Sequence, residues 1–276
     1  MTRAPHASDA PLGVFDSGLG GLTVVRALRA ALPSEHIVYL GDTARVPYGT
    51  KGAATVVKYA LGCAHHLVGR GVKAIVIACN TVSAVAPDSM RVELDLPVLG
   101  VIEPGARAAV AASRTGRIGV LATAGTIASG AYPRAVAQES TRAEVIGQSA
   151  PLLVPLAEEG WTEGEVPRLA ARRYLEPLAK ARVDVILLGC THYPLLRGVL
   201  SAEAHALMGP EVTLVDSADA TAVSVREFLI TRGLARDEGR GPGGIELLVT
   251  DLPKTFREVA GRFLGGEVAD VEQVDL

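Results

Sequence analysis

Two cysteines with matching surroundings are the residues of this chain best suited to acid–base chemistry. Cys79 lies in the run Ile75-Val76-Ile77-Ala78-Cys79-Asn80-Thr81, and Cys190 lies in Ile186-Leu187-Leu188-Gly189-Cys190-Thr191-His192. A short apolar run that ends in polar residues is typical of a buried parallel strand leading into a loop. Because open α/β sheets bind ligands at the carboxyl ends of their strands, we expect the two thiols to face one substrate from opposite sides. Such an arrangement suits a reaction with mirror-image steps, such as racemisation.

The similarity extends beyond the cysteines. The two cysteines are 111 residues apart (190 − 79), and an upstream pair of segments is offset by 106 residues (119 − 13), namely Gly13-Val14-Phe15-Asp16-Ser17 and Gly119-Val120-Leu121-Ala122-Thr123. Two similar offsets in the same order predict a duplicated α/β unit. The alternative is that strand ends resemble one another in any α/β protein.

Strand-like and helical patterns alternate along the whole chain. Apolar runs that predict strands lie at 12–15, 37–40, 73–78, 98–102, 117–121, 143–146, 183–188, 212–215 and 245–249. Helical patterns lie near 20–32, 50–69, 82–94, 105–113, 162–180, 193–208, 217–232 and 252–264. This alternation predicts an α/β fold of mainly parallel sheets flanked by helices.

The duplication predicts two pseudo-symmetric lobes. We expect the chain to cross between them at Glu103-Pro104-Gly105 and again at Asp216-Ser217. The first lobe then comprises residues 1–103 plus 216–276, and the second comprises residues 104–215. The active site is expected in the cleft between them.

Composition excludes several classes of protein. The 276 residues are 49% apolar, which is enough for a packed core. The net charge of −3 offers no electrostatic reason to bind nucleic acid or an anionic membrane. Three cysteines without Cys-x-x-Cys spacing predict neither a disulfide framework nor a metal site. The first ten residues do not have the pattern of a secretory signal, and no apolar run approaches the ~20 residues that span a bilayer, so we expect a cytoplasmic protein.

A glycine-rich segment, Asp16-Ser17-Gly18-Leu19-Gly20-Gly21-Leu22-Thr23, follows the first predicted strand. Its glycines allow close approach of a ligand, and the amides at the start of the next helix favour an anion. The lysine of a P-loop and the third glycine of a dinucleotide fingerprint are both missing, so a carboxylate is the better-sized anion. The alternative is a tight turn in which Asp16 caps the helix.

A second polar loop, Gly41-Asp42-Thr43-Ala44-Arg45-Val46-Pro47-Tyr48-Gly49-Thr50-Lys51, follows the second predicted strand. Its backbone amides and the Tyr48 hydroxyl are suited to substrate binding. It is equally consistent with an ordinary connection in which Thr50 caps the next helix.

Each of the two cysteines precedes a predicted helix, whose amino terminus would stabilise a thiolate. His192 could tune Cys190 or shuttle its proton, or it could simply be a helix cap or a core histidine. Cys63 is expected to be a small buried side chain without function. Of the adjacent acids Glu158 and Glu159, spacing alone singles out neither.

The set of motifs resembles the glutamate racemase family, within the wider aspartate/glutamate racemase superfamily. The resemblance covers about residues 12–220 and is carried by Val14-Phe15-Asp16-Ser17-Gly18-Leu19-Gly20-Gly21, Gly41–Gly49, Ala78-Cys79-Asn80-Thr81, Val101-Ile102-Glu103-Pro104-Gly105-Ala106, Thr123-Ala124-Gly125-Thr126-Ile127 and Leu188-Gly189-Cys190-Thr191-His192-Tyr193-Pro194-Leu195-Leu196. One departure is Ala150, where members of the family often have cysteine.

The resemblance implies a cofactor-independent enzyme that interconverts L- and D-glutamate and supplies D-glutamate for peptidoglycan. Cys79 and Cys190 would be the paired bases, with Asp16 near the first and His192 and Glu158 near the second. It implies a substrate site made of Asp16, Ser17, Pro47, Tyr48, Gly49, Asn80, Thr81, Thr123, Thr126, Thr191 and His192. It further implies no metal, a small-molecule substrate as the main partner, and a homodimer.

Three other functions are weighed against this one. An enzyme of the same superfamily could act on another acid, although a decarboxylase would need only one cysteine. A non-catalytic amino-acid-binding module would have no use for two thiols. A redox dithiol protein would need the two Cα atoms within about 7 Å of each other, which leaves no room for a substrate between them.

Overall fold

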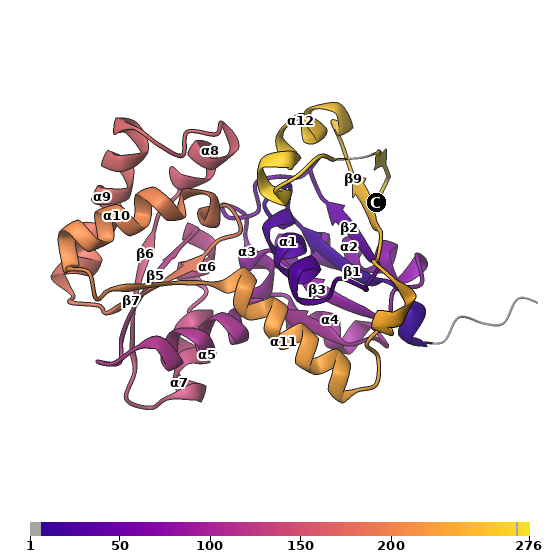
Figure 1. Cartoon of the computed structure of the whole chain (residues 1–276), viewed down its shortest axis with the longest axis horizontal. Coiled ribbons are helices and arrows are strands. Elements are labelled where there is room, and N and C mark those ends of the chain that lie inside the picture. Colours follow the sequence, from indigo (N-terminus) through magenta and orange to yellow (C-terminus); the bar gives the residue numbers. More distant parts are fainter. Residues whose placement is uncertain (1–6, 269) are drawn as a thin grey trace, which may run out of the picture.

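Two parallel β-sheets, each flanked by helices, make up the computed structural model, which describes residues 7–268 and 270–276 (Figure 1). The expected absence of a secretory signal concerns residues 1–10, of which the first six lie outside the described residues. No helix in the described part of the chain is both long enough and apolar enough to span a bilayer.

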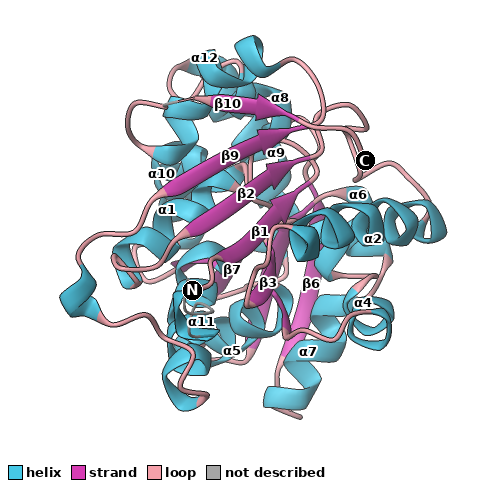
Figure 2. Cartoon of the chain, turned by 90° about the vertical axis from the view of Figure 1, so that its right-hand side faces the viewer, coloured by secondary structure: helices cyan, strands magenta, loops and turns pink. Residues whose placement is uncertain are grey.

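The first sheet has six strands in the order β10-β9-β2-β1-β3-β4, and every neighbouring pair is parallel. Figure 2 shows these strands fanning across the lobe with helices on both faces. The central strands are buried along their whole length, which explains why they read as continuous apolar runs. The six strands are β1 (Leu12–Asp16), β2 (Ile37–Gly41), β3 (Ala74–Ile77), β4 (Val98–Gly100), β9 (Ile245–Val249) and β10 (Val271–Gln273).

The second sheet has four parallel strands in the order β6-β5-β7-β8. They are β5 (Arg117–Ala122), β6 (Glu144–Ser149), β7 (Val185–Gly189) and β8 (Thr213–Asp216). The order repeats β2-β1-β3-β4 of the first sheet, so that β1 corresponds to β5 and β3 to β7. The prediction of two α/β lobes with mainly parallel sheets is confirmed, and the repeated strand order is what a duplicated unit would produce.

Most of the predicted helices are present with shifted ends. They are α1 (Leu22–Ala31), α2 (Ala53–Gly69), α5 (Ile102–Ala112), α9 (Glu165–Lys180), α10 (Arg197–Met208), α11 (Ser217–Thr231) and α12 (Pro253–Leu264). Thr50 does not cap α2, because the helix begins three residues later and its N-cap residue is Gly52. Three-residue 3-10 helices lie at Ala7–Asp9 (η1) and Glu238–Arg240 (η3).

The helix predicted at 82–94 is two helices, α3 (Asn80–Ser83) and α4 (Pro87–Glu93). Pro87 is the first residue of α4, a position where its missing amide hydrogen costs nothing, but it cannot continue a preceding helix. The helix predicted at 193–208 likewise begins as a separate 3-10 turn, η2 (Tyr193–Leu196).

Three helices and one strand were missed by the sequence patterns. The helices α6 (Ala124–Ala128), α7 (Ala131–Glu139) and α8 (Leu153–Glu158) are too short to show a clear period, and the three-residue strand β10 is shorter still.

The chain passes from the first sheet to the second between β4 and β5, and back between β8 and β9. It leaves the first sheet at Gly100 and enters α5, which packs on the second sheet, so Glu103-Pro104-Gly105 lies inside the first helical turns. It returns after β8 through α11, which packs against both α5 and α1 (Figure 1). Asp216 begins this return, because its carboxylate accepts a hydrogen bond from the amide of Ala218 at 2.8 Å and so caps α11.

Candidate active site

A cavity of about 350 Å³ lies between the two sheets and receives residues from both. Its volume suits a small amino acid. The residues that line it are Ser17, Val46, Pro47, Tyr48, Gly49, Thr50, Cys79, Asn80, Thr81, Thr123, Ala124, Pro151, Val154, Pro155, Glu158, Cys190, Thr191 and His192.

The strand order explains why these residues meet. In each sheet the chain runs from the central strand to one side and then returns to the other side, which creates a crevice at the carboxyl ends of β1 and β3 and of β5 and β7. Asp16 and Cys79 come from the first pair of strand ends, and Thr123 and Cys190 come from the second. The cavity therefore lies where the two crevices face each other.

Most of the predicted site residues line this cavity, and two lie behind its wall. Asp16 and Thr126 are each 1% exposed and contact lining residues instead of the space itself. The sequence patterns missed an apolar part of the wall formed by Val46, Ala124, Pro151, Val154 and Pro155. Val46 and Ala124 lie inside motifs that carry the family resemblance, and the departure at Ala150 lies next to Pro151.

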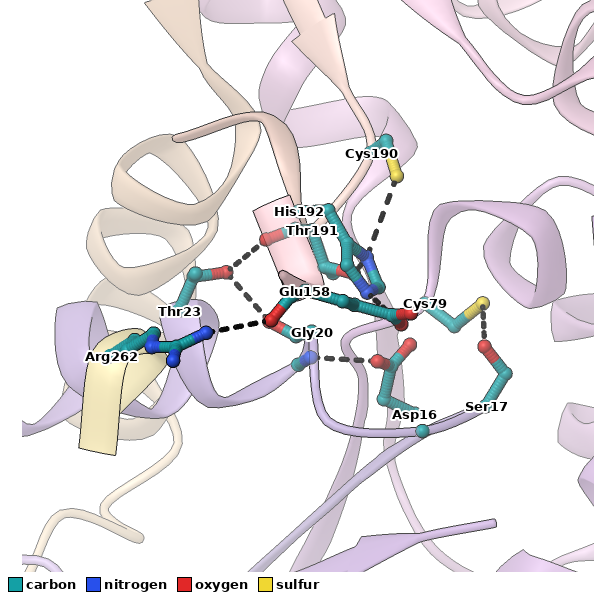
Figure 3. Close-up of polar contacts among 12 residues, drawn as sticks. Asp16, Ser17, Gly20, Thr23, Cys79, Glu158, Cys190, Thr191, His192 and Arg262 are labelled. Carbon is teal, nitrogen blue, oxygen red and sulfur yellow. Dashed lines mark hydrogen bonds and ion pairs between the residues drawn. The ribbon is translucent and has the colours of Figure 1, made fainter. Parts of the chain in front are cut away.

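Cys79 is the N-cap residue of α3 and is 5% exposed. Its Sγ lies 3.7 Å from the Ser17 Oγ, as Figure 3 shows. Burial, together with the negative charge of Asp16, raises the pKa of the Cys79 thiol well above its ordinary value, although hydrogen bonds from Val82 and Ser17 oppose this shift. Since α3 has only four residues, local amides rather than a long helix dipole act on this sulfur.

Asp16 is held in place behind Cys79. One carboxylate oxygen, Oδ2, accepts a hydrogen bond at 2.7 Å from the amide of Gly21, which is itself the N-cap residue of α1, so Asp16 supports the turn before the helix but does not cap it. The other oxygen, Oδ1, is buried and has no partner among the described residues. Because this oxygen lies behind the wall, its charge would act on a positively charged group of a ligand at a distance and not through direct contact.

Cys190 has a different set of neighbours. Its Sγ lies 3.9 Å from the His192 Nδ1, and the opposite ring nitrogen, Nε2, lies 3.0 Å from the Glu158 Oε1 (Figure 3). Burial alone would lower the pKa of His192, but its contacts with Cys190 and Glu158 outweigh burial and raise that pKa to about 10. The imidazole therefore carries a positive charge at neutral pH and can stabilise negative charge on the neighbouring sulfur.

The geometry distinguishes the two adjacent acids. Glu158 is the last residue of α8, lines the cavity and contacts His192. Glu159 instead lines a separate surface pocket together with Arg26 and Arg262.

A cluster of threonine hydroxyl groups lies at another part of the cavity wall. The Oγ1 atoms of Thr81 and Thr123 are 3.0 Å apart, and that of Thr126 lies 3.0 Å from Thr123. Beside them, Asn80 receives a hydrogen bond on its Oδ1 from the Tyr132 hydroxyl at 2.6 Å, while its Nδ2 is buried without a partner among the described residues. The Asn80 amide without a partner and the neighbouring hydroxyls, which could exchange their bonds to one another for bonds to a ligand, suit a carboxylate.

The loop between β2 and α2 is anchored by the buried carboxylate of Asp42. Asp42 accepts hydrogen bonds from the Tyr48 hydroxyl, from the Arg45 Nε at 2.6 Å and from the Thr250 Oγ1 at 2.9 Å. Gly49, which follows Tyr48, accepts a hydrogen bond on its carbonyl from the amide of Gly125 in α6 at 3.0 Å. The tyrosine hydroxyl is thus engaged with Asp42.

Cys63 is fully buried beneath this loop, and its Sγ lies 4.0 Å from the Arg45 Nη2. Burial raises its pKa to about 12. It does not line the cavity.

The two lobes also touch beside His192. The Thr23 hydroxyl donates to the Thr191 carbonyl at 2.9 Å, and a Cβ placed on Gly20 would lie 2.3 Å from the Thr191 Oγ1 and 2.5 Å from the His192 ring. Only a glycine permits this approach.

Gly20→Ala is therefore expected to displace His192 and lower kcat by roughly tenfold, because overpacking by about 1–3 kcal/mol must be relieved by movement. Steady-state kinetics in both directions tests this, with Gly62→Ala as a control. Gly62 lies in α2 with nothing within 4 Å of its added Cβ, so that variant should keep wild-type activity. Wild-type kinetics for Gly20→Ala would show that the contact does not matter.

Among the described residues, no group of three or more His, Cys, Asp or Glu side chains could hold a metal ion.

Comparison with known proteins places the chain in a family. The family model for Asp/Glu/hydantoin racemases matches residues 22–225. A glutamate racemase of Geobacter metallireducens is 51% identical over 265 residues, which cover 96% of each chain. The structure of the glutamate racemase of Francisella tularensis in complex with D-glutamate has a TM-score of 0.88 and 36% identity over 97% of this chain and 98% of that one. The structure of the glutamate racemase of Thermus thermophilus in complex with β-chloro-D-alanine has a TM-score of 0.86 and 45% identity over 98% of both chains. The chain belongs to the Asp/Glu/hydantoin racemase family, and within it to the glutamate racemases, which are amino-acid racemases.

Proposed function

We propose that this protein interconverts L- and D-glutamate without a cofactor, with Cys79 and Cys190 as the two bases. The observation that carries this proposal is that both thiols line one small cavity and come from corresponding strand ends of two similar sheets. A substrate held in that cavity would have one sulfur on each side of its α-carbon.

In one direction, the Cys79 thiolate removes the α-proton and becomes a thiol, while the electron pair remains on the α-carbon as a carbanion. The Cys190 thiol then gives its proton to the opposite face and becomes a thiolate. In the other direction the two cysteines exchange roles. No net proton is consumed, and water must be kept out of the cavity to protect the carbanion.

The wall residues would bind and polarise the substrate. The free Asn80 Nδ2 and the hydroxyls of Thr81 and Thr123 would donate to a carboxylate, and the backbone around Tyr48 and Gly49 would contribute to the same binding. Donors at the α-carboxylate stabilise the carbanion, because its charge spreads onto those oxygens. Pro47, Ser17 and Thr191 would complete the enclosure, with Thr126 supporting it from behind.

The environment of Cys79 favours activation by the substrate itself. Burial and the negative charge of Asp16 raise the pKa of the Cys79 thiol and so favour its neutral form. The ammonium group of glutamate would bring a positive charge near the Asp16 Oδ1 and partly offset the negative charge of that carboxylate. The pKa of the Cys79 thiol would then fall, which favours the thiolate.

Incubation with L-glutamate in D₂O tests the proposal. The expected result is decay of the optical rotation to zero together with incorporation of one deuterium at the α-carbon. A binding protein would show neither change, and a superfamily enzyme with another substrate would act on that acid instead. If glutamate keeps both its rotation and its α-hydrogen, the proposal is wrong.

Tyr132→Phe is expected to raise KM for glutamate by roughly tenfold. Its hydroxyl is the partner that orients Asn80, and a buried polar group left without a partner costs about 1–3 kcal/mol. Steady-state kinetics measures the change, and Tyr59→Phe, whose ring packs nearby on Tyr48, is the matched control. An unchanged KM would show that the hydrogen bond from Tyr132 to Asn80 does not contribute to glutamate binding.

We further propose that the product serves peptidoglycan synthesis in the cytoplasm and that the active form is a homodimer. The relationship to glutamate racemases supports the first point, and growth of a D-glutamate-requiring strain on expression of this chain tests it. Sedimentation tests the second.

We also propose lobes comprising residues 1–103 plus 216–276 and residues 104–215, with α5 packed on the second sheet from Ile102 onward.

A further inference from the structure

Glu158 is poorly fixed by its own helix. It is the last residue of α8, which has only six residues, and its side chain is 38% exposed. Helices of this length are not stable by themselves, and an exposed carboxylate has many competing orientations in water. Its contact with His192 at 3.0 Å therefore needs support from elsewhere in the fold.

That support comes from α12, a helix that packs on α1 of the first lobe. The Arg262 Nη1 donates to the main-chain carbonyl of Glu158 at 2.8 Å, as Figure 3 shows. The guanidinium lies directly against Gly160, where an added Cβ would be 2.9 Å from the same nitrogen. An arginine that binds a free carbonyl at a helix end also complements the dipole there.

The next residue of α12 contacts the other member of the pair. Phe263 is fully buried, and its ring meets the His192 ring edge-on at a centroid distance of 5.3 Å and an interplanar angle of 81°. This geometry is favoured for aromatic pairs and limits rotation of the imidazole. Consecutive residues of one helix thus hold Glu158 by its backbone and His192 by its ring.

We propose that Arg262 is a positioning residue for catalysis: it holds Glu158 against His192 and so keeps the imidazole in place beside Cys190, with Phe263 fixing the ring. This inference rests on the proposed two-cysteine function. It makes the first lobe a contributor to the acid–base pair of the second lobe, so that the Cys190 half of the reaction depends on α12.

A double-variant experiment tests this role. The kinetic constants are measured in both directions and over a range of pH for wild type, Glu158→Gln, Arg262→Gln and the combined variant, with thermal unfolding for each. We expect Arg262→Gln to lower kcat by roughly tenfold, since hydrogen bonds from charged donors are among the stronger ones. It should affect the same direction as Glu158→Gln and shift the same limb of the pH profile. The combined variant should be no more than about twofold slower than Glu158→Gln alone, because both changes remove one interaction.

Two further variants make the test specific. Arg262→Lys, which keeps a charged donor, should recover part of the activity. Arg257→Gln alters an exposed arginine of the same helix, paired with Asp270 at 3.6 Å, and should leave kinetics unchanged. Equal loss in both directions, losses that multiply in the combined variant, or wild-type kinetics for Arg262→Gln would each overturn the inference. If instead wild type does not racemise glutamate, or Glu158→Gln has no effect, it is the proposed function or the role of Glu158 that fails.

Discussion

Cys79→Ala and Cys190→Ala are each expected to lower kcat for racemisation by at least about 10³-fold. Each direction of the reaction needs one thiolate to take the α-proton and one thiol to return a proton on the other face, and acid–base groups contribute on this scale. Replacement of either cysteine by serine should also be strongly deleterious, because a hydroxyl is hardly ionised near neutral pH. Polarimetry with each enantiomer measures the loss.

A glutamate analogue with chlorine at Cβ separates the two cysteines. Removal of its α-proton by one base expels chloride and forms the unsaturated amino acid, so no second proton transfer is needed. Cys79→Ala should therefore still release chloride from one enantiomer, and Cys190→Ala from the other. Cys63→Ala is the control, since Cys63 lies outside the cavity and should retain activity. Near wild-type racemisation by either cavity variant would disprove the two-base mechanism.

His192→Asn and Asp16→Asn are expected to slow opposite directions of the reaction, each by roughly 10²-fold in kcat. His192 lies beside Cys190, and its charge would stabilise the Cys190 thiolate. Asp16 lies behind Cys79 and raises its pKa, so its loss slows the reaction only through the substrate: the proposed attraction between the Asp16 carboxylate and the glutamate ammonium group is removed. Because the two enantiomers have equal free energy, kcat/KM must be the same in both directions for every variant, so KM must change together with kcat. Initial rates with D- and L-glutamate measure this split. If both directions keep wild-type kcat in both variants, these side chains only cap and pack.

The charge of His192 gives this prediction a pH dependence. The pKa of His192 is raised to about 10, so the imidazole is charged at neutral pH and loses its charge as the pH rises through that value. In wild type, kcat in the direction that uses Cys190 as base should fall as the pH rises through about 10. The same fall should be absent from His192→Asn. The same sign applies to stability: a pKa raised on folding stabilises the protein fully below the unfolded value of about 6.5 and loses that contribution as pH rises through the folded pKa. Thermal unfolding at each pH therefore accompanies the kinetics, so that loss of structure is not mistaken for loss of catalysis.

The sequence by itself determined the fold class and the location of the candidate site. Buried parallel strands require continuous apolar runs, and the carboxyl ends of such strands meet at one edge of a sheet. The runs that end at Cys79 and Cys190 therefore predicted where the cavity lies. The break in the helix expected at 82–94 was also open to a local rule, because Pro87 cannot continue a helix, but the apolar pattern alone ran through it.

The tertiary structure alone decided which side chains reach the cavity and what supports them. Asp16 is the last residue of β1, yet it lies behind the wall, since its carboxylate turns to the Gly21 amide. Glu158 and Glu159 are neighbours with the same chemistry, and the difference between them arises from contacts with residues 34 and 104 positions away, His192 and Arg262. Local sequence patterns indicate whether a segment forms a helix or a strand and which of its faces is buried. The direction of a side chain at a helix end is instead set by packing against distant segments. That packing exists only once both lobes are folded together.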